Sequence, residues 1–335
     1  MRSPALLKKL LLTLPTLFGV LVVVFVLMRV VPGDPAALML SSESTAQDLV
    51  EARKSLGLDR PLPVQFASYL GDVLKGDFGR SITMKQDVME LVFGRLPATL
   101  ELALTALFIA APCALLLALV AVYWRGSWID GAVDAFNSFC LAIPEFLWAI
   151  LLILAFAVLL PWLPISGRLD PVQQLQFRTP FYFFEAVLTG QFRTAGHLLS
   201  YLVLPAVALA LPFMAVIARV LKSSLADAMS QDYTQLARVK GFSEARVLSR
   251  HALPNALLPT VTVTGVHFVL LVGGTVMVEL IFAFPGIGNL LYTAAINRDL
   301  PLIQGVTITF AVLFVVLNTL VDLTYALLNP RLSEQ

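Results

Sequence analysis

Six long stretches of this sequence contain no Asp, Glu, Lys or Arg, and they constrain the fold more than any other feature. Each stretch is 19 to 27 residues long. A helix of about 20 apolar residues spans the hydrocarbon core of a bilayer, so each stretch predicts a transmembrane helix. The six predicted spans are residues 10–28, 102–124, 146–167, 198–218, 252–278 and 300–321.

The composition places these stretches in lipid rather than in a soluble core. Only 13% of the residues are charged, against roughly 25% in a typical soluble domain, and the mean hydropathy is +0.84. These values exclude a disordered chain, a nucleic-acid binder and an ordinary cytosolic enzyme. Two cysteines, Cys113 and Cys140, are too few for a disulfide scaffold. We therefore expect an all-α membrane protein that contacts lipid and no nucleic acid.

Charges and prolines modify two of the predicted spans. Three basic residues precede the first span, as in a signal peptide, but its apolar run is too long and no cleavage site follows, so we expect a retained anchor. The third span is expected to begin earlier, near Ala132, because only Asp134 and Glu145 interrupt the apolar run there. Neighbouring helices can satisfy the backbone groups that prolines free in or near the spans: Pro112, Pro144, Pro205 and Pro212.

Lys and Arg in the short loops predict the orientation. A cytoplasmic N-terminus puts most of them inside, as the positive-inside rule requires. The short outside segments hold only Arg168, Arg178, Arg193 and Arg298. Six spans then place both termini in the cytoplasm.

The remaining polar residues gather in two segments. The outside loop, 32–97, contains a predicted helix at 47–54, a second at 64–74 and a turn at 76–79, so we expect a small extracytoplasmic helical cap. The predicted domains are 1–31 for the N-terminal segment and first span, 32–97 for the cap, and 98–335 for the core. The core includes a cytoplasmic loop at 222–255.

The cytoplasmic loop predicts two short helices joined at Gly241. Glycine tolerates the positive φ that a sharp turn needs. Apolar residues recur at helical spacing on both sides of it: Leu236 and Val239 before it, and Ala245, Leu248 and Ala252 after it. We expect this hairpin to present a basic, partly apolar side to the cytoplasm.

The hairpin resembles the EAA loop of ABC-importer permeases. The matching residues are Ala237, Gly241, Leu253 and Pro254. Three residues depart from the general pattern of Glu, Ala and Ile: Gln235, Leu236 and His251. The peptide-permease branch has a version closer to this one, with Asp232-Tyr233 before the alanine and His251 after the glycine.

Other segments resemble the same branch in the same order along nearly the whole chain. They are residues 32–35, 56–61, 76–81, 95–102, 166–168, 279–288, 322–325 and 329–331. The chain is thus similar to B-type permeases of binding-protein-dependent importers for dipeptides, oligopeptides, nickel and related solutes.

The resemblance implies a type I importer permease fold with six transmembrane helices in a bacterial inner membrane. It also implies a heterodimeric pore with a second, homologous permease, two cytoplasmic ATP-binding subunits and an external solute-binding protein. ATP and Mg²⁺ would bind the partner subunits, and no cofactor would bind this chain. The sequence agrees, because it has no Gly-Lys dipeptide and hence no Walker A loop.

The resemblance further implies that the hairpin couples the pore to an ATPase subunit. The predicted coupling residues are Asp232, Tyr233, Ala237, Arg238, Gly241, Arg246, His251, Leu253 and Pro254.

Ionisable residues and paired glycines near the membrane are candidates for the translocation pathway. Glu145 follows Pro144, where a broken helix facing a cavity is expected. Glu279 either caps backbone donors or lines the pathway. Gly273 and Gly274 either allow close helix contact or flank a gate. Glu101 and Asp322 are expected at span ends, with structural partners.

Other functional classes receive less support. A stand-alone secondary transporter or channel would show inverted repeats or a charged relay, and the sequence has no clear example of either. An intramembrane enzyme would need a motif such as H-E-x-x-H or G-x-S-x-G, and neither is present. The three histidines are too far apart in sequence to suggest a local metal site, so no catalytic or metal residue is predicted. Peptide is the expected solute, with nickel, glutathione or another small solute as alternatives.

Overall fold

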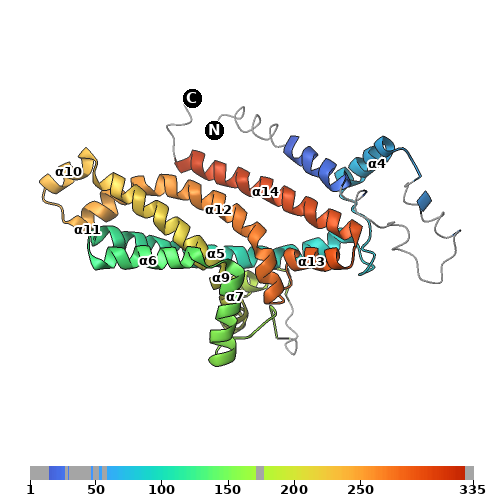
Figure 1. The fold of residues 1–335 in the computed structure, drawn as a ribbon, viewed down its shortest axis with the longest axis horizontal. Helices are drawn as coiled ribbons and strands as arrows, with labels where there is room; N and C mark the ends of the chain where they lie inside the picture. Colours follow the sequence, from blue (N-terminus) through green and yellow to red (C-terminus); the bar gives the residue numbers. More distant parts are fainter. Residues whose placement is uncertain are drawn as a thin grey trace. The chain divides into compact units, whose positions relative to one another are not determined.

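The computed structural model describes residues 15–26, 29, 47, 53–54, 59–170 and 177–328 as a chain of helices (Figure 1). Within these ranges there is no β-strand, only an isolated bridge between Arg80 and Asp87. After the helix at Pro15–Val26, the labelled helices are α4 (Leu62–Lys75), α5 (Val88–Tyr123), α6 (Trp128–Ala142), α7 (Glu145–Ile153), α8 (Tyr182–Leu188), α9 (Phe192–Met229), α10 (Asp232–Val239), α11 (Glu244–Arg246), α12 (Leu253–Ile281), α13 (Ile287–Ile296) and α14 (Leu300–Leu328). Leu154–Leu159 and Val247–Ala252 are π-helical.

Four helical segments are long and apolar enough to cross a bilayer: Val88–Tyr123, Phe192–Met229, Glu244–Ile281 and Leu300–Thr324. They contain the fourth, fifth and sixth predicted spans and all of the second except its last residue, Trp124. A fifth span results if α6 and α7 are counted together. The predicted first span lies partly outside the described residues, and the helix described there, Pro15–Val26, is too short to count as a full span. The all-helical membrane fold is therefore confirmed, while the count of six stays a prediction.

The third predicted span, 146–167, extends past the end of the observed helix. The helical backbone ends at Leu159, and the earlier start is real, since α6 begins at Trp128. The helix Trp128–Ala142 and the helix Glu145–Leu159 meet at a bend of 97°. Proline causes this break, because its ring disfavours helical backbone at the preceding residue, and Ile143 before Pro144 is extended with φ −101° and ψ 120°.

Prolines elsewhere are accommodated within helices. Pro97 and Pro112 lie inside α5, and Pro205 and Pro212 lie inside α9. Since α5 already begins at Val88, Glu101 lies well inside this helix, although the predicted span starts only at Leu102. The predicted helix boundary followed the last charged residue, but a helix continues as long as its backbone bonds can form.

The described residues divide into two compact units, 1–96 with 290–315 and 97–289 with 316–335. In the first unit, α4 matches the predicted amphipathic stretch at 64–74 and ends at Gly76, which has φ 77°. Phe66 on α4 packs edge-on against Phe25, with ring centroids 5.0 Å apart. The guanidinium of Arg29 lies 3.4 Å above the same Phe25 ring. The predicted helix at 47–54 lies largely outside the described residues.

Asp299 organises the polar part of this first unit. Its Oδ2 accepts hydrogen bonds from the Ser81 hydroxyl at 2.6 Å and from the Thr83 hydroxyl and backbone N–H at 2.7 and 3.0 Å. Its Oδ1 accepts one from the Leu302 backbone N–H in the first turn of α14. Burial alone would raise the pKa of the Asp299 carboxyl, but these hydrogen bonds outweigh it and hold the pKa below its usual value.

We expect Asp299→Asn to lower the free energy of unfolding by about 1.5–3 kcal/mol at neutral pH. Both carboxylate oxygens of Asp299 accept hydrogen bonds, whereas an asparagine amide has only one acceptor oxygen. Its NH₂ group would face hydrogen-bond donors and leave them without an acceptor. A depressed pKa stabilises the fold above the unfolded pKa of about 3.9, and this stabilisation is lost as pH falls through the folded value. The variant should therefore lose less thermal stability than the native chain on acidification. Melting temperatures measured at several pH values check this, and Asp72→Asn, at an exposed position, is the control. The prediction is contradicted if the melting temperatures of Asp299→Asn and of the native chain fall by the same amount as pH is lowered.

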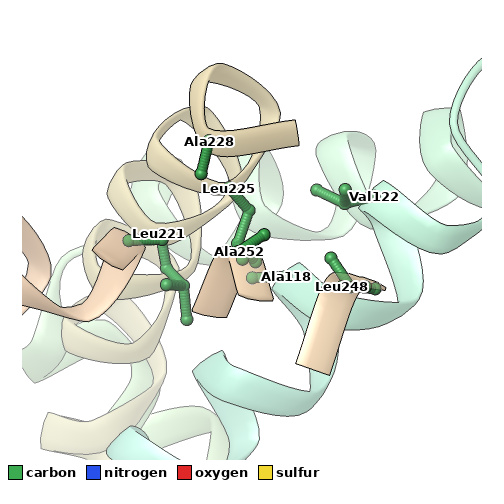
Figure 2. Packing of buried hydrophobic residues seen from close by; sticks show 8 residues of the cluster. Ala118, Val122, Leu221, Leu225, Ala228, Leu248 and Ala252 are labelled. Atoms are coloured by element: carbon green, nitrogen blue, oxygen red, sulfur yellow. The ribbon is translucent and has the colours of Figure 1, made fainter. Parts of the chain in front are cut away.

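Small residues build the core of the second unit. Along α5 a row of fully buried alanines follows helical spacing: Ala103, Ala106, Ala110, Ala114, Ala118 and Ala121. Such a face lets neighbouring helices approach closely. Toward one end of α5, Ala118 and Val122 pack with residues of α9, of the π-helix at Val247–Ala252 and of α12 (Figure 2). These residues are Leu221, Leu225, Ala228, Leu248, Ala252 and Ala256.

An ionic contact links α6 to α9 in the same unit. The Lys222 ammonium lies 2.5 Å from an Asp130 carboxylate oxygen and 2.6 Å from an Asp134 oxygen. Asp134 therefore has the structural partner that its position near the end of a span suggests.

Candidate functional site

The predicted hairpin is present, and Gly241 makes its turn. Helix α10 covers Asp232–Val239, and α11 begins at Glu244. Gly241 has φ 82°, in the left-handed region that glycine favours. The Gly241 N–H bonds the Arg238 carbonyl at 2.9 Å and the Phe242 N–H bonds the Ala237 carbonyl at 3.3 Å, the two bonds of a Schellman motif. The positive-φ turn expected from the sequence is therefore confirmed.

A charged pair fixes the two limbs of the hairpin relative to each other. Arg238 Nε donates to Glu244 Oε1 at 2.7 Å, and Arg238 Nη2 donates to Glu244 Oε2 at 3.3 Å. Arg238 Nη1 also donates to the Met229 carbonyl at the end of α9. One guanidinium thus joins α9, α10 and α11.

The second limb connects the hairpin to the membrane core. Leu248 and Ala252 are buried in the cluster that contains Ala118 and Leu225. The Phe242 ring lies 5.5 Å from the His251 ring, centroid to centroid, and the Arg246 guanidinium lies 5.5 Å from the Phe242 ring centroid. The spanning helix α12 follows this limb directly at Leu253.

The opposite side of α10 is apolar and exposed. Thr234 and Ala237 are buried, whereas Leu236 is 54% and Val239 is 83% exposed, and Tyr233 beside them is 40% exposed. The shared face of Leu236 and Val239 expected from their spacing is therefore real and points away from the core. Ala245, by contrast, is exposed while Leu248 and Ala252 are buried, so these three residues do not form one buried face.

The structure distributes the predicted coupling residues between the surface and the interior. The exposed ones are Asp232, Tyr233, Gly241, Arg246 and Pro254. The buried or partly buried ones are Ala237, Arg238, His251 and Leu253. The first group is exposed enough to contact another protein, and in the second group only Ala237 is fully buried.

Two of the predicted pathway residues meet in a cavity of about 180 Å³ between α6, α7, α9 and α12. Glu145 and Gly274 both line it, together with His267 and apolar residues. A Cβ atom at Gly274 would lie 2.8 Å from Glu145 Oε1, so the glycine leaves room for the carboxylate. Gly273, in contrast, is exposed and has no atom within 4 Å of a Cβ position.

Glu279 lies apart from that cavity, in a buried hydrogen-bond network. Its Oε1 accepts from the Thr99 hydroxyl at 2.7 Å, and its Oε2 accepts from the Asn289 backbone N–H at 3.0 Å. Thr99 Oγ1 in turn accepts from the Ile287 N–H. This geometry matches the expectation that Glu279 caps backbone donors of the turn after α12.

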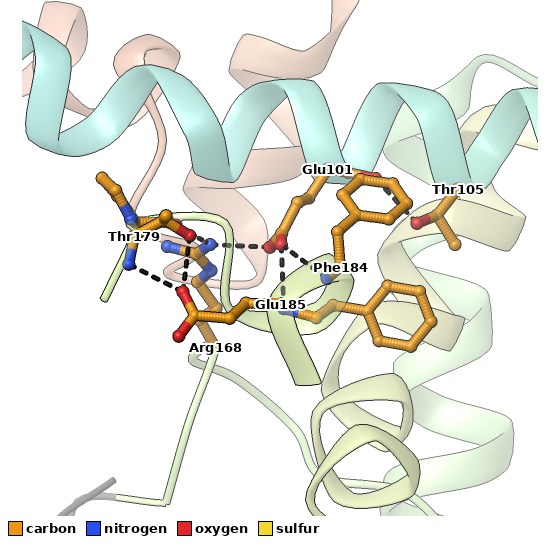
Figure 3. Close-up of polar contacts among 8 residues, drawn as sticks. Glu101, Thr105, Arg168, Thr179, Phe184 and Glu185 are labelled. Carbon is orange, nitrogen blue, oxygen red and sulfur yellow. Dashed lines mark hydrogen bonds and ion pairs between the residues drawn. The ribbon is translucent and has the colours of Figure 1, made fainter. Parts of the chain in front are cut away.

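The sequence did not reveal a buried ion pair between Glu101 and Arg168, which are 67 positions apart (Figure 3). Arg168 Nη2 lies 2.6 Å from Glu101 Oε2, and their side chains are 6% and 1% exposed. Glu101 Oε1 also accepts from the backbone N–H groups of Phe183 and Phe184 at the start of α8. The available signal was an acid directly before a charge-free stretch of α5, but its partner lies in a loop.

Comparison with known proteins identifies the family of this chain. Residues 92–334 match the family described as binding-protein-dependent transport system inner membrane component, and residues 4–103 match the N-terminal family of the same membrane components. The di/tripeptide transport system permease protein DppB of Pseudomonas aeruginosa is 38% identical over 98% of both chains. The oligopeptide transport system permease protein AppB of Bacillus subtilis is 37% identical over 97% of this chain and 98% of its own. The dipeptide transport system permease protein DppB of Alkalihalophilus pseudofirmus is 34% identical over the same shares. The chain therefore belongs to the family of inner-membrane components of binding-protein-dependent transport systems.

Proposed function

We propose that this chain is the pore subunit of an ATP-driven importer that carries dipeptides or oligopeptides delivered by an external solute-binding protein. The observation that carries the proposal is similarity over nearly the full length to permeases named for dipeptide, di/tripeptide and oligopeptide transport. The multi-pass helical fold is compatible with a pore, and the chain itself is not catalytic.

The pore is completed by a second, homologous permease, and two cytoplasmic subunits bind ATP and Mg²⁺. Both termini face the cytoplasm, where the basic hairpin also lies. The cap at 32–97 faces outward. These assignments follow from the family resemblance and from the distribution of Lys and Arg.

The hairpin is the contact with an ATPase subunit. Its exposed apolar pair, Leu236 and Val239, is flanked by exposed Tyr233, Lys240 and Arg246. An apolar centre with a polar, charged rim is the usual anatomy of a protein interface. The Arg238–Glu244 pair and the packing of Leu248 and Ala252 make the hairpin rigid enough to transmit a rigid-body movement to α12.

We expect Val239→Asp to abolish coupling while the chain still folds. Val239 is already exposed, so the substitution changes the chain's own stability little, but it places an unpaired charge in the ATPase contact. The penalty for a buried unpaired charge, about 2 kcal/mol or more, predicts a loss of solute-stimulated ATPase activity of at least about tenfold. The measurement is ATPase activity and subunit co-purification of the full complex in lipid vesicles.

Val239→Ile is the matched control, because it keeps the apolar surface and should retain activity. Normal ATPase coupling in Val239→Asp would remove this face from the proposed interface. A separate experiment tests the cargo. If vesicles that contain the native complex, the binding protein and ATP import no peptide, peptide is not the cargo.

A further inference from the structure

The cavity at Glu145 contains a carboxylate for which the described residues offer no charged partner. Its lining is mostly apolar, with Leu209, Phe213 and Leu270 beside Glu145 and His267. In the described part of the chain, no other side chain forms an ion pair or hydrogen bond with the Glu145 carboxylate. A carboxylate in such surroundings is costly unless a cation or several donors reach it.

The local backbone holds this carboxylate at the cavity. Pro144 breaks the helix, and Glu145 is the first residue of α7, at the 97° corner with α6. Across the cavity, Gly274 on α12 provides the space into which the carboxylate extends, since a Cβ there would lie 2.8 Å from Glu145 Oε1. Helix α9 contributes Pro212 and Phe213 as an apolar wall.

We propose that Glu145 binds the α-ammonium group of a peptide as it crosses the membrane, an inference that rests on the proposed peptide cargo. The ammonium is a compact cation with three donors, which suits an unpaired carboxylate in an apolar site. Every unmodified peptide carries this group at its N-terminus, whatever its side chains. A site that binds only the N-terminal ammonium accepts peptides of many different sequences. The His267 imidazole supplies a second polar group for the adjoining peptide bond.

A metal ion fits this cavity less well than an ammonium group. A transition-metal site in a protein usually has three or four side-chain ligands. Among the residues that the structure describes, no group of three His, Cys, Asp or Glu is close enough to hold a metal, and this cavity offers only Glu145 and His267. An anionic ligand would be repelled by the same carboxylate.

The test compares uptake of a free dipeptide and its N-acetylated form by the full complex in vesicles. Glu145→Gln keeps the shape of the side chain and removes its charge, so uptake of the free dipeptide should fall about tenfold, the effect of one lost charge-assisted contact. Uptake of the N-acetylated dipeptide should change less than about twofold, because it has no ammonium to bind. For each peptide, the uptake rate of the variant is divided by that of the native complex. The binding protein is the same in both complexes, so its own preference for one of the two peptides cancels in this ratio.

Three further variants support the reading of this test. Glu145→Asp keeps the charge and should retain the preference for the free dipeptide. Gly274→Ala displaces the carboxylate and should give an intermediate loss that is again selective for the free dipeptide, as expected of a positioning residue. Glu90→Gln removes an exposed carboxylate far from the cavity in sequence and should change neither uptake rate.

Equal losses for both peptides in Glu145→Gln, or no loss for either, would overturn the α-ammonium site while leaving peptide import intact. Failure of the native complex to import either peptide would instead overturn the proposed cargo and this site with it. Measuring the amount of each variant in the vesicles separates lost uptake from poor insertion.

Discussion

Arg168→Met is expected to lower the free energy of unfolding by about 3–5 kcal/mol, because removing one member of a buried ion pair leaves the other charge uncompensated. Glu101 and Arg168 are both almost fully buried, with 2.6 Å between Nη2 and Oε2. Arg168 also donates to the Pro180 carbonyl, and its guanidinium lies 4.0 Å from the centroid of the Tyr182 ring. Loss of Arg168 thus releases the loop before α8 from α5. Thermal unfolding of the purified chain in detergent measures the effect.

Two controls separate the ion pair from general damage to the loop. Glu185→Gln alters an exposed carboxylate in the same region, which accepts from the Arg178 and Thr179 backbone N–H groups at 2.7 Å, and should cost much less. Arg168→Lys keeps the charge but not the planar guanidinium, and should fall between the native chain and Arg168→Met. A melting temperature for Arg168→Met equal to that of the native chain would mean that the pair contributes nothing to stability.

Gly288→Ala is the second large expected effect, a destabilisation of about 1–3 kcal/mol from overpacking. A Cβ at this position would lie 2.7 Å from the Cα of Val276 and 2.9 Å from Glu279 Oε2. The carboxylate end can move, but the Val276 Cα belongs to the backbone of α12. The helix itself would have to shift, and the bonds from Thr99 and Asn289 to Glu279 would lengthen. Thermal unfolding again provides the measurement.

Gly273→Ala is the matched control for Gly288→Ala. Gly273 lies in α12 with no atom within 4 Å of a Cβ position and without a positive φ, so alanine should be neutral or slightly stabilising through its helix propensity. Equal melting temperatures for the two alanine variants would show that the contact at Val276 relaxes without cost.

Local features of the sequence predicted much of the fold correctly. Charge-free runs located four spanning helices because a bilayer requires long apolar helices regardless of their neighbours. Gly241 predicted its turn because a positive φ is a property of one residue. Pro144 indicated a broken helix for the same reason, although the predicted third span still continued past the observed end at Leu159.

Features that depend on distant partners were predicted less well. Glu101 was expected to have a structural partner, but the sequence did not indicate that this partner is Arg168, in a loop 67 positions away. Glu145 and Gly274 were both named from the sequence, yet nothing in it indicates that α7 and α12 bring them to one cavity with His267. The sequence left two roles open for Glu279, and it did not indicate the bonds that its carboxylate accepts from Thr99 and Asn289.

The sequence by itself determined a helical membrane protein, the position of its helical hairpin at Gly241 and its resemblance to importer permeases. These follow from composition, local periodicity and single-residue backbone preferences, which act over a few turns of helix. Only the tertiary structure decided which face of the hairpin is exposed, which acids are paired and which one is left at a cavity. Pairing of side chains depends on how helices far apart in the chain pack together. The degree of burial then determines how much free energy of unfolding is lost when one member of a pair is removed.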